Sequence, residues 1–140
     1  MTNEHDILLG FDFGMKRIGV AVGQTVTRTA RALTTLKAEN GMPNKEALSK
    51  LIKIWQPTAI IVGIPLNMDG TEQAITQEAR RFVEMLRNLF KIPVYEMDER
   101  LTTKSARETL FEEGGYKALQ NGQVDRVAAQ LILQNWINNH

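Results

Sequence analysis

The sequence predicts one mixed α/β domain over residues 1–140, with the element order βββαβαβαα. Three strand-like segments joined by short links open the chain, which is typical of an antiparallel meander. Segments with helical apolar periodicity then alternate with short apolar runs, which indicates parallel strands and crossover helices. The chain contains no internal repeat, linker or low-complexity segment, so we expect a single hydrophobic core.

The first three strands follow closely on one another. Residues 7–13 are almost entirely apolar, which predicts a strand buried on both faces. A short turn leads to residues 17–23, the expected antiparallel return strand, and a third strand is predicted at about residues 29–37. Residues 40–43 then break the chain, and Pro43 is well placed for the start of a helix.

The middle of the chain predicts a helix, a strand and a loop. Residues 44–55 carry apolar residues on one helical face, and residues 59–64 form a short, doubly buried strand. The loop at residues 65–72 is either a mobile loop over a site or a tight turn held by Asn67 and Asp69. Asp69 is also expected to cap the helix that follows.

The last part of the chain completes the pattern. Apolar residues at helical spacing predict a second helix over about residues 75–90. A strand is expected at residues 92–97, where Pro93 favours the edge of the sheet. Helices are expected at about residues 103–113 and 123–138.

Composition excludes several classes of protein. The chain has no cysteine, so it has neither a disulfide framework nor a thiolate metal site. No apolar run approaches the roughly 18–20 residues that span a bilayer, and the first residues lack the basic region of a signal peptide. We therefore expect a cytoplasmic protein without membrane contact. The net charge of +1 does not by itself indicate a nucleic-acid-binding protein.

Asp12 interrupts the apolar run of the first strand. An ionised carboxylate buried there without compensation would be costly, so a positive partner is required. Lys16, Arg17 and a bound cation are the candidates. Two interpretations stay open at this point: Asp12 is a metal ligand, or it caps the following turn or pairs with Arg17.

Three further acids are placed where they could join Asp12. Asp98 and Glu99 end the last strand, and because side chains alternate across a strand, only one of them shares a face with Asp12. The alternative for this pair is a helix cap or an ion pair with Arg100. Asp125 lies in the first turn of the last helix, where the helix dipole alone would explain a carboxylate.

Three carboxylates from two strands and a late helix can hold one or two Mg²⁺ or Mn²⁺ ions, because these hard cations prefer oxygen ligands. Such a site activates an attacking water and stabilises the leaving oxygen of a phosphodiester. Three acids in a chain of this length are common by chance, so spacing alone does not select this interpretation.

Four segments together resemble the bacterial YqgF family, also called RuvX or Holliday-junction-resolvase-like. Their sequences are FDFGMKRIGVAVG at residues 11–23, IVGIPLNMDGTE at 61–72, DERLTT at 98–103 and VDRVAAQLILQ at 124–134. The resemblance covers essentially the whole chain in the order of the family. The four motifs together are much more specific than any one of them.

The resemblance implies a ribonuclease-H-like fold with a five-stranded mixed sheet whose first three strands are antiparallel. It also implies a catalytic and metal-binding site in which Asp12 matches the first-strand aspartate, Glu99 the strand-end acid and Asp125 the last-helix aspartate. Mg²⁺ or Mn²⁺ is the implied cofactor. Family members are assigned to maturation of the 5′ end of the precursor of 16S ribosomal RNA, and related resolvases suggest cleavage of four-way DNA junctions.

The chain departs from the family pattern at two positions. Arg126 stands where the family usually has a serine after the last-helix aspartate. Its guanidinium can contact phosphate, or it can pair with Asp125 and compete with metal. Gln24 stands where the family often has an aspartate, and we assign it no role.

Basic residues are the candidate contacts to nucleic acid. Lys16 and Arg17 adjoin Asp12 and can bind the scissile phosphate, although Arg17 can equally hold the hairpin. Other candidates fall near one side of the helix expected after the last strand, where they can follow a nucleic-acid backbone. The full set is Lys16, Arg17, Arg100, Lys104, Arg107 and Arg126.

Three functions compete at this point. The first is a metal-dependent endonuclease that processes the 5′ end of pre-16S ribosomal RNA, and the second is a Holliday-junction resolvase acting on branched DNA. The third is a non-catalytic nucleic-acid-binding module, against which the three retained acids argue. An ATPase of the actin-like class is excluded by length, because it needs two lobes. We expect a monomer or a weak homodimer.

Overall fold

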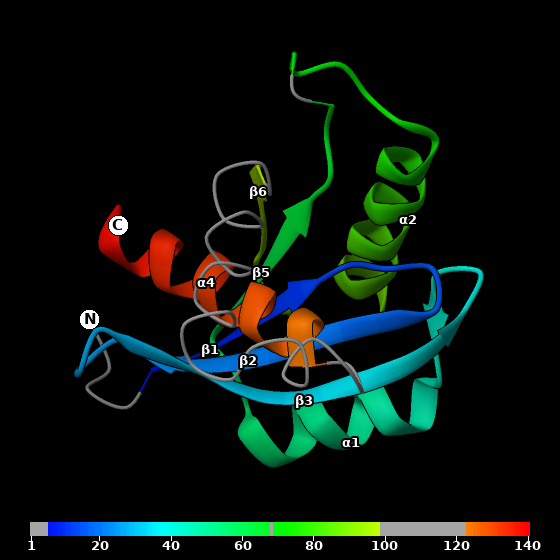
Figure 1. Cartoon of the computed structure of the whole chain (residues 1–140). Helices are drawn as coiled ribbons and strands as arrows, with labels where there is room; N and C mark the ends of the chain where they lie inside the picture. Colours follow the sequence, from blue (N-terminus) through cyan, green and yellow to red (C-terminus); the bar gives the residue numbers. More distant parts are fainter. Residues whose placement is uncertain (1–5, 68, 99–122) are drawn as a thin grey trace.

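The structure, a computed structural model, describes residues 6–67, 69–98 and 123–140. In these residues six strands form one sheet in the order β4-β3-β2-β1-β5-β6 (Figure 1). β2 (Arg17–Gln24) pairs antiparallel with both β1 (Ile7–Asp12) and β3 (Thr29–Glu39). β5 (Ala59–Ile64) and β6 (Val94–Asp98) run parallel to β1. The predicted α/β class and antiparallel first three strands are confirmed, and β6 lies at the sheet edge, as Pro93 indicated.

The described sheet has one strand more than the five that we predicted. β3 runs to Glu39, beyond the predicted residues 29–37, and reverses at Asn40 and Gly41 to pair with the two-residue strand β4 (Met42–Pro43). Both turn residues have positive φ, 52° and 81°. This combination is that of a type I′ hairpin turn, for which Asn-Gly is a preferred sequence. The prediction of a simple break at residues 40–43 was therefore wrong.

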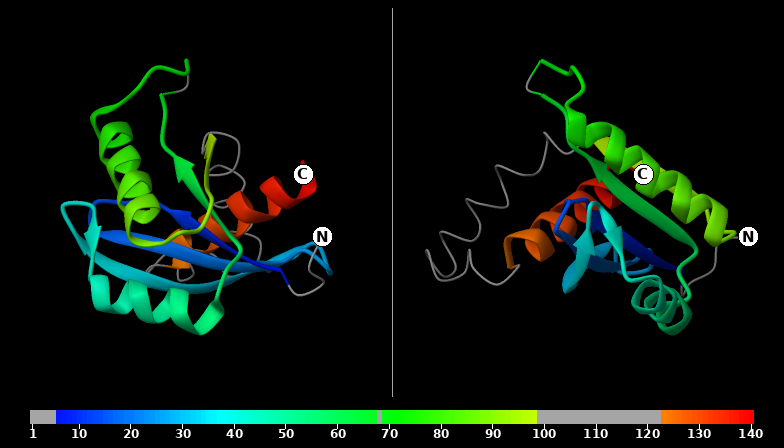
Figure 2. Two further views of the ribbon diagram at one scale, coloured as in Figure 1. Left: turned by 180° about the vertical axis from the view of Figure 1, so that it is seen from behind. Right: turned by 90° about the vertical axis from the view of Figure 1, so that its right-hand side faces the viewer.

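Helices cover both faces of the sheet. α1 (Lys45–Trp55) and α2 (Ala74–Leu89) lie on one face and α4 (Gln123–Asn138) on the other (Figure 2). α1 begins after Asn44, whose side chain accepts hydrogen bonds from the backbone N–H groups of Glu46 and Ala47 at 2.9 and 3.1 Å. Within the described ranges, no helix combines the length and the apolar character needed to cross a membrane. The helix predicted at residues 103–113 lies outside the described residues.

α2 spans nearly the predicted residues 75–90, but Asp69 does not cap it, contrary to the prediction. The N-cap is Gln73, and the helix starts at Ala74. The Asp69 carboxylate instead accepts a hydrogen bond from the backbone N–H of Thr71 at 2.9 Å. The backbone N–H of Asn67 donates to the carbonyl oxygen of Thr71 at 2.9 Å. The described residues between 65 and 72 therefore make the local hydrogen bonds that the tight-turn alternative predicted.

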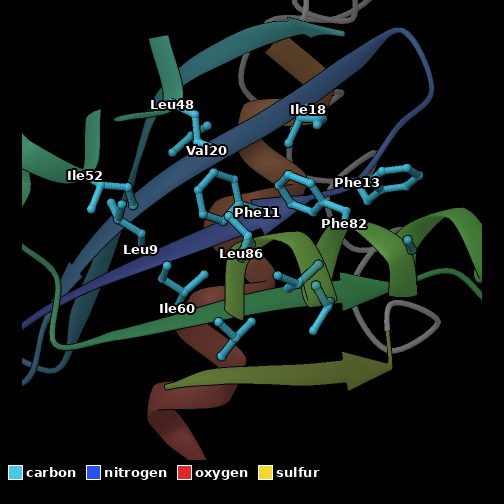
Figure 3. Packing of buried hydrophobic residues seen from close by; sticks show 14 of the residues in the cluster. Leu9, Phe11, Phe13, Ile18, Val20, Leu48, Ile52, Ile60, Phe82 and Leu86 are labelled. Atoms are coloured by element: carbon cyan, nitrogen blue, oxygen red, sulfur yellow. The ribbon is translucent and has the colours of Figure 1, made fainter. Parts of the chain in front are cut away.

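Side chains of the sheet alternate between two hydrophobic clusters. The larger cluster lies under α1 and α2, where Phe11 of β1 meets Phe82 of α2 with ring centroids 5.6 Å apart (Figure 3). Each such buried side chain contributes about 1.5–3 kcal/mol of hydrophobic stabilisation. The second cluster lies under α4 and includes Leu8 of β1. Odd-numbered residues of β1 therefore face α1 and α2, and even-numbered residues face α4.

Candidate active site

Asp12 is the last residue of β1 and is only 8% exposed. Side chains alternate between the two faces along a strand, so Asp12 faces the same side as Leu8 and Gly10. Both of these residues contact α4, so the Asp12 side chain points to the α4 face of the sheet. In the ladders it lies opposite Gly19 of β2 and Gly63 of β5. Neither neighbour has a side chain, so the adjacent strands add no bulk beside the carboxylate.

The first turn of α4 crosses β2 at Gly19, directly beside Asp12. A Cβ built on Gly19 would lie 1.9 Å from the carbonyl oxygen of Asp125 and 2.9 Å from the backbone nitrogen of Arg126. Only glycine allows so close an approach of the two backbones. Because Gly19 is the register partner of Asp12, this contact brings Asp125 to the end of β1 that carries Asp12. A glycine inside a strand pattern is the sequence signal for such a contact, and the candidate site residues predicted from the sequence did not include Gly19.

Arg17 joins the same site from the start of β2. Its Nε atom lies 3.3 Å from Oδ2 of Asp125. The side chain of Arg17 is 61% exposed and that of Asp125 is 26% exposed, so solvent screens the attraction and the pair adds little stability. The main effect of this ion pair is to hold the guanidinium of Arg17 and the carboxylate of Asp125 close together at the edge of the site.

Burial and two neighbouring guanidinium groups act in opposite directions on the charge of Asp125. Burial raises the pKa of Asp125 above its ordinary value of 3.8. The charge and hydrogen bond of Arg17, and the charge of Arg126, lower this pKa but by less than burial raises it. The two guanidinium groups therefore offset the desolvation of the ionised Asp125 carboxylate only in part.

The orientation of side chains along β6 shows whether Asp98 can lie on the same face of the sheet as Asp12. Glu96, two residues before Asp98, lies 3.6 Å from Nε of Arg80 on α2. Because side chains alternate along a strand, Asp98 shares this face and points away from the face of Asp12. Glu99 itself lies outside the described residues.

The other predicted site residues are only partly described. Three of the predicted nucleic-acid contacts lie outside the described residues: Arg100, Lys104 and Arg107. Lys16 is exposed in the turn between β1 and β2, and its carbonyl oxygen accepts a hydrogen bond from Ala38 at 2.8 Å. Arg126 follows Asp125 in the first turn of α4. Over the described ranges, which omit Glu99, no group of three His, Asp or Glu side chains is arranged as a metal site.

The sequence is similar to known proteins over nearly its whole length. The family model described as "RuvX: Holliday junction resolvase" matches residues 6–139. A protein of Shewanella oneidensis named "Putative pre-16S rRNA nuclease" is 54% identical over 133 residues, which are 95% of this chain and 94% of that protein. A protein of the same name from Haemophilus ducreyi is 50% identical over 133 residues, covering 95% and 96% of the two chains.

Solved structures share the architecture. Thermus thermophilus RuvC in complex with a Holliday junction substrate superimposes with a TM-score of 0.59 and 21% identity, over 96% of this chain and 95% of that one. The Fowlpox virus resolvase in complex with Holliday junction DNA gives a TM-score of 0.56 and 12% identity, over 95% and 97% of the two chains. At these identities the similarity shows the fold, which is ribonuclease-H-like as predicted.

Proposed function

Because this chain belongs to the RuvX family, we propose that it is a nuclease that cleaves the precursor of 16S ribosomal RNA at its 5′ end. The substrate is suggested by relatives that are 50% or more identical over nearly the whole chain and carry the name "Putative pre-16S rRNA nuclease". The 5′ end as the cleavage position is what the resemblance of the sequence motifs implies. The observation that supports the nuclease activity is that Asp12 lies opposite Gly19 in the sheet, while the backbone of Asp125 packs against the same Gly19.

In this proposal Asp12 and Asp125 hold a divalent cation, with Glu99 as a third ligand. The donor set fits Mg²⁺ or Mn²⁺, which prefer carboxylate oxygens. The partly compensated charge of Asp125 fits a cation as well. When bound, the metal supplies Lewis-acid chemistry, activating water and stabilising negative charge on the phosphodiester.

The protein's own side chains bind and orient the substrate. Arg17, held at Asp125, and Lys16, in the adjoining turn, place positive charge beside Asp12. This charge attracts the phosphodiester and favours its more negative transition state. The close contact of α4 with Gly19 keeps Asp125 at a constant position relative to Asp12. His140, the one histidine among the described residues, lies beyond the C-terminal end of α4, whereas Asp125 is in its first turn, so we do not assign His140 as a general base.

Cleavage of branched DNA is the second candidate function. The observation that favours it is the match to a family model described as a Holliday junction resolvase. Both candidate functions would use the same carboxylates, so the active-site chemistry cannot distinguish them. Only the nucleic acid that is cleaved distinguishes one function from the other.

The test is cleavage of an RNA that spans the junction between the precursor leader and the mature 5′ end, with Mg²⁺ or Mn²⁺. We expect cutting at one defined position by the wild type. Asp12→Asn, Asp125→Asn and Glu99→Gln should each lose about 100-fold or more of the rate, because even outer-shell changes at metal sites cost 10–100-fold. Asp98→Asn is the matched control and should keep the activity, because Asp98 faces α2.

A four-way DNA junction is incubated in parallel. Defined cutting of this DNA while the RNA stays intact would replace the first candidate by the second. Binding of either nucleic acid without cleavage, and without a metal requirement, would identify a non-catalytic module.

A further inference from the structure

A basic groove adjoins the candidate active site where β2 begins and β3 ends. It encloses about 870 Å³. Its charged side chains are three cations, Lys16, Arg17 and Lys37, and one acid, Glu39. The complete lining is Lys16, Arg17, Lys37, Ala38, Glu39, Asn40, Met42, Pro43 and Asn44. The groove is therefore net positive, although the whole chain carries a charge of only +1.

Two of these cations lie directly opposite each other in the sheet. Arg17 and Lys37 are register partners in the antiparallel ladder of β2 and β3. Cross-strand partners share a face and their side chains are close, so two like charges in this position repel and weaken the pairing. The repulsion is only partly relieved, because Arg17 contacts Asp125 while Lys37 takes part in none of the ion pairs found in the described part of the chain. An anion bound between the two cations would remove it.

The Arg17–Lys37 pair faces the same side of the sheet as the candidate active site. The contact of Arg17 with Asp125 places Arg17 on the α4 face, and Lys37 shares that face as its register partner. Asp12 lies in the adjacent row of this face, opposite Gly19. The two rows are two residues apart along the strands, about 7 Å, and β3 lies two strands from β1, about 10 Å. A lysine side chain at position 37 therefore reaches the neighbourhood of a strand whose scissile phosphate is at Asp12.

We propose that Lys37, together with Arg17, binds a backbone phosphate of the RNA strand adjacent to the phosphate that is cleaved. This inference rests on the proposed nuclease function and adds to it a residue and a path for the substrate through the basic groove. A lysine ammonium binds phosphate as a point charge without reading bases. Lys37 would thus position the strand, and sequence selection would lie elsewhere.

The test measures RNA binding and its dependence on salt. A fluorescently labelled RNA that spans the precursor–mature junction is titrated with protein in EDTA, which prevents metal-dependent cleavage, at several KCl concentrations. Lys37→Gln should weaken binding several-fold at low salt and reduce the slope of log affinity against log salt by about 1, the effect of losing one phosphate contact. Lys37→Arg should restore both values, because it keeps the charge.

Lys91→Gln is the matched control for charge. Lys91 precedes β6 at the amino ends of the parallel strands, whereas Asp12 lies at the carboxyl end of β1. Its replacement should leave the affinity and the slope unchanged. The melting temperature of Lys37→Gln should not fall, because the substitution removes a like-charge pair. A merely structural role for Lys37 predicts the opposite result, a lower melting temperature.

The outcomes separate this inference from the proposed function. An unchanged salt slope in Lys37→Gln, with normal cleavage by the wild type, would overturn the role of Lys37 alone. A reduced slope in Lys37→Gln, with no cleavage by the wild type, would support phosphate binding and overturn the nuclease function. If Lys37→Gln weakens binding of a four-way DNA junction but not of the RNA, RNA is not the ligand of the groove and the inference as stated is wrong.

Discussion

Replacing Gly19 with alanine should separate α4 from the sheet at the candidate active site. A Cβ at this position would lie 1.9 Å from the carbonyl oxygen of Asp125 and 2.2 Å from its carbonyl carbon. Ordinary van der Waals contact begins at 3.4 Å. The carbonyl oxygen of Asp125 must therefore move from 1.9 Å to 3.4 Å, so the backbone of α4 must retreat by about 1.5 Å. Neither atom belongs to a side chain that can rotate away, so the whole first turn must move.

The expected magnitudes follow from this displacement. Overpacking costs about 1–3 kcal/mol, and we expect about 3 kcal/mol because the obstacle is backbone. For a domain of this size each kcal/mol lowers the melting temperature by about 4 °C, so Gly19→Ala should melt about 12 °C below the wild type. Moving Asp125 by more than 1 Å relative to Asp12 should lower kcat/KM for RNA cleavage by about 100-fold.

Gly23→Ala is the matched control, on the same strand and facing the same helix. Its tightest contacts would be the side-chain ends of Leu133 and Ile137 at 3.0 and 3.1 Å, with the carbonyl oxygen of Thr29 also at 3.1 Å. We expect a loss of about 1 kcal/mol and no loss of cleavage. Thermal unfolding by circular dichroism and the cleavage assay measure both variants. A Gly19→Ala protein with wild-type melting temperature and activity would refute the close contact.

Three further outcomes concern Asp125, Asp12 and Asn44. Asp125 has a raised folded-state pKa, so its stabilising contribution is complete below the unfolded value of 3.8 and is lost as pH rises through the folded value. In urea unfolding with EDTA, Asp125→Asn should therefore gain stability relative to the wild type as pH rises above the unfolded value of 3.8, and a relative loss would mean that the Arg17 ion pair outweighs burial. MnCl₂ at about 100 times its Kd should stabilise the wild type by about 2.7 kcal/mol, and Asp12→Asn should lose most of the accompanying rise in melting temperature. A rise retained in full would place the metal elsewhere. Asn44→Ala should lose the cap of α1 and about 1 kcal/mol, while Asn44→Asp should retain it; equal melting temperatures of the two variants would contradict the capping role.

Local sequence patterns determined most of the secondary structure and the anomaly at Asp12. The span of β5 (Ala59–Ile64) and that of α4 (Gln123–Asn138) agree with the predicted residues, because apolar periodicity and turn residues act over a few neighbouring positions. The missed strand β4 had a local signal as well, since Asn40-Gly41 is a hairpin sequence. The sequence alone showed that burying the ionised carboxylate of Asp12 in a strand costs free energy unless a cation compensates it. The family motifs then implied Glu99 and Asp125 as the other acids of the site.

Only the tertiary structure decided which of these side chains meet. Asp98 is excluded from the face of Asp12 by the register of β6, and Arg17 meets Asp125 across more than one hundred residues of sequence. The roles of Gly19 and Lys37 depend on contacts of β2 with α4 and β3. Strand register and helix crossing are set by the packing of distant segments, and spacing along the chain carries no record of them. The sequence by itself therefore identified the acids as candidates, and the fold determined that Asp12 and the backbone of Asp125 both adjoin Gly19.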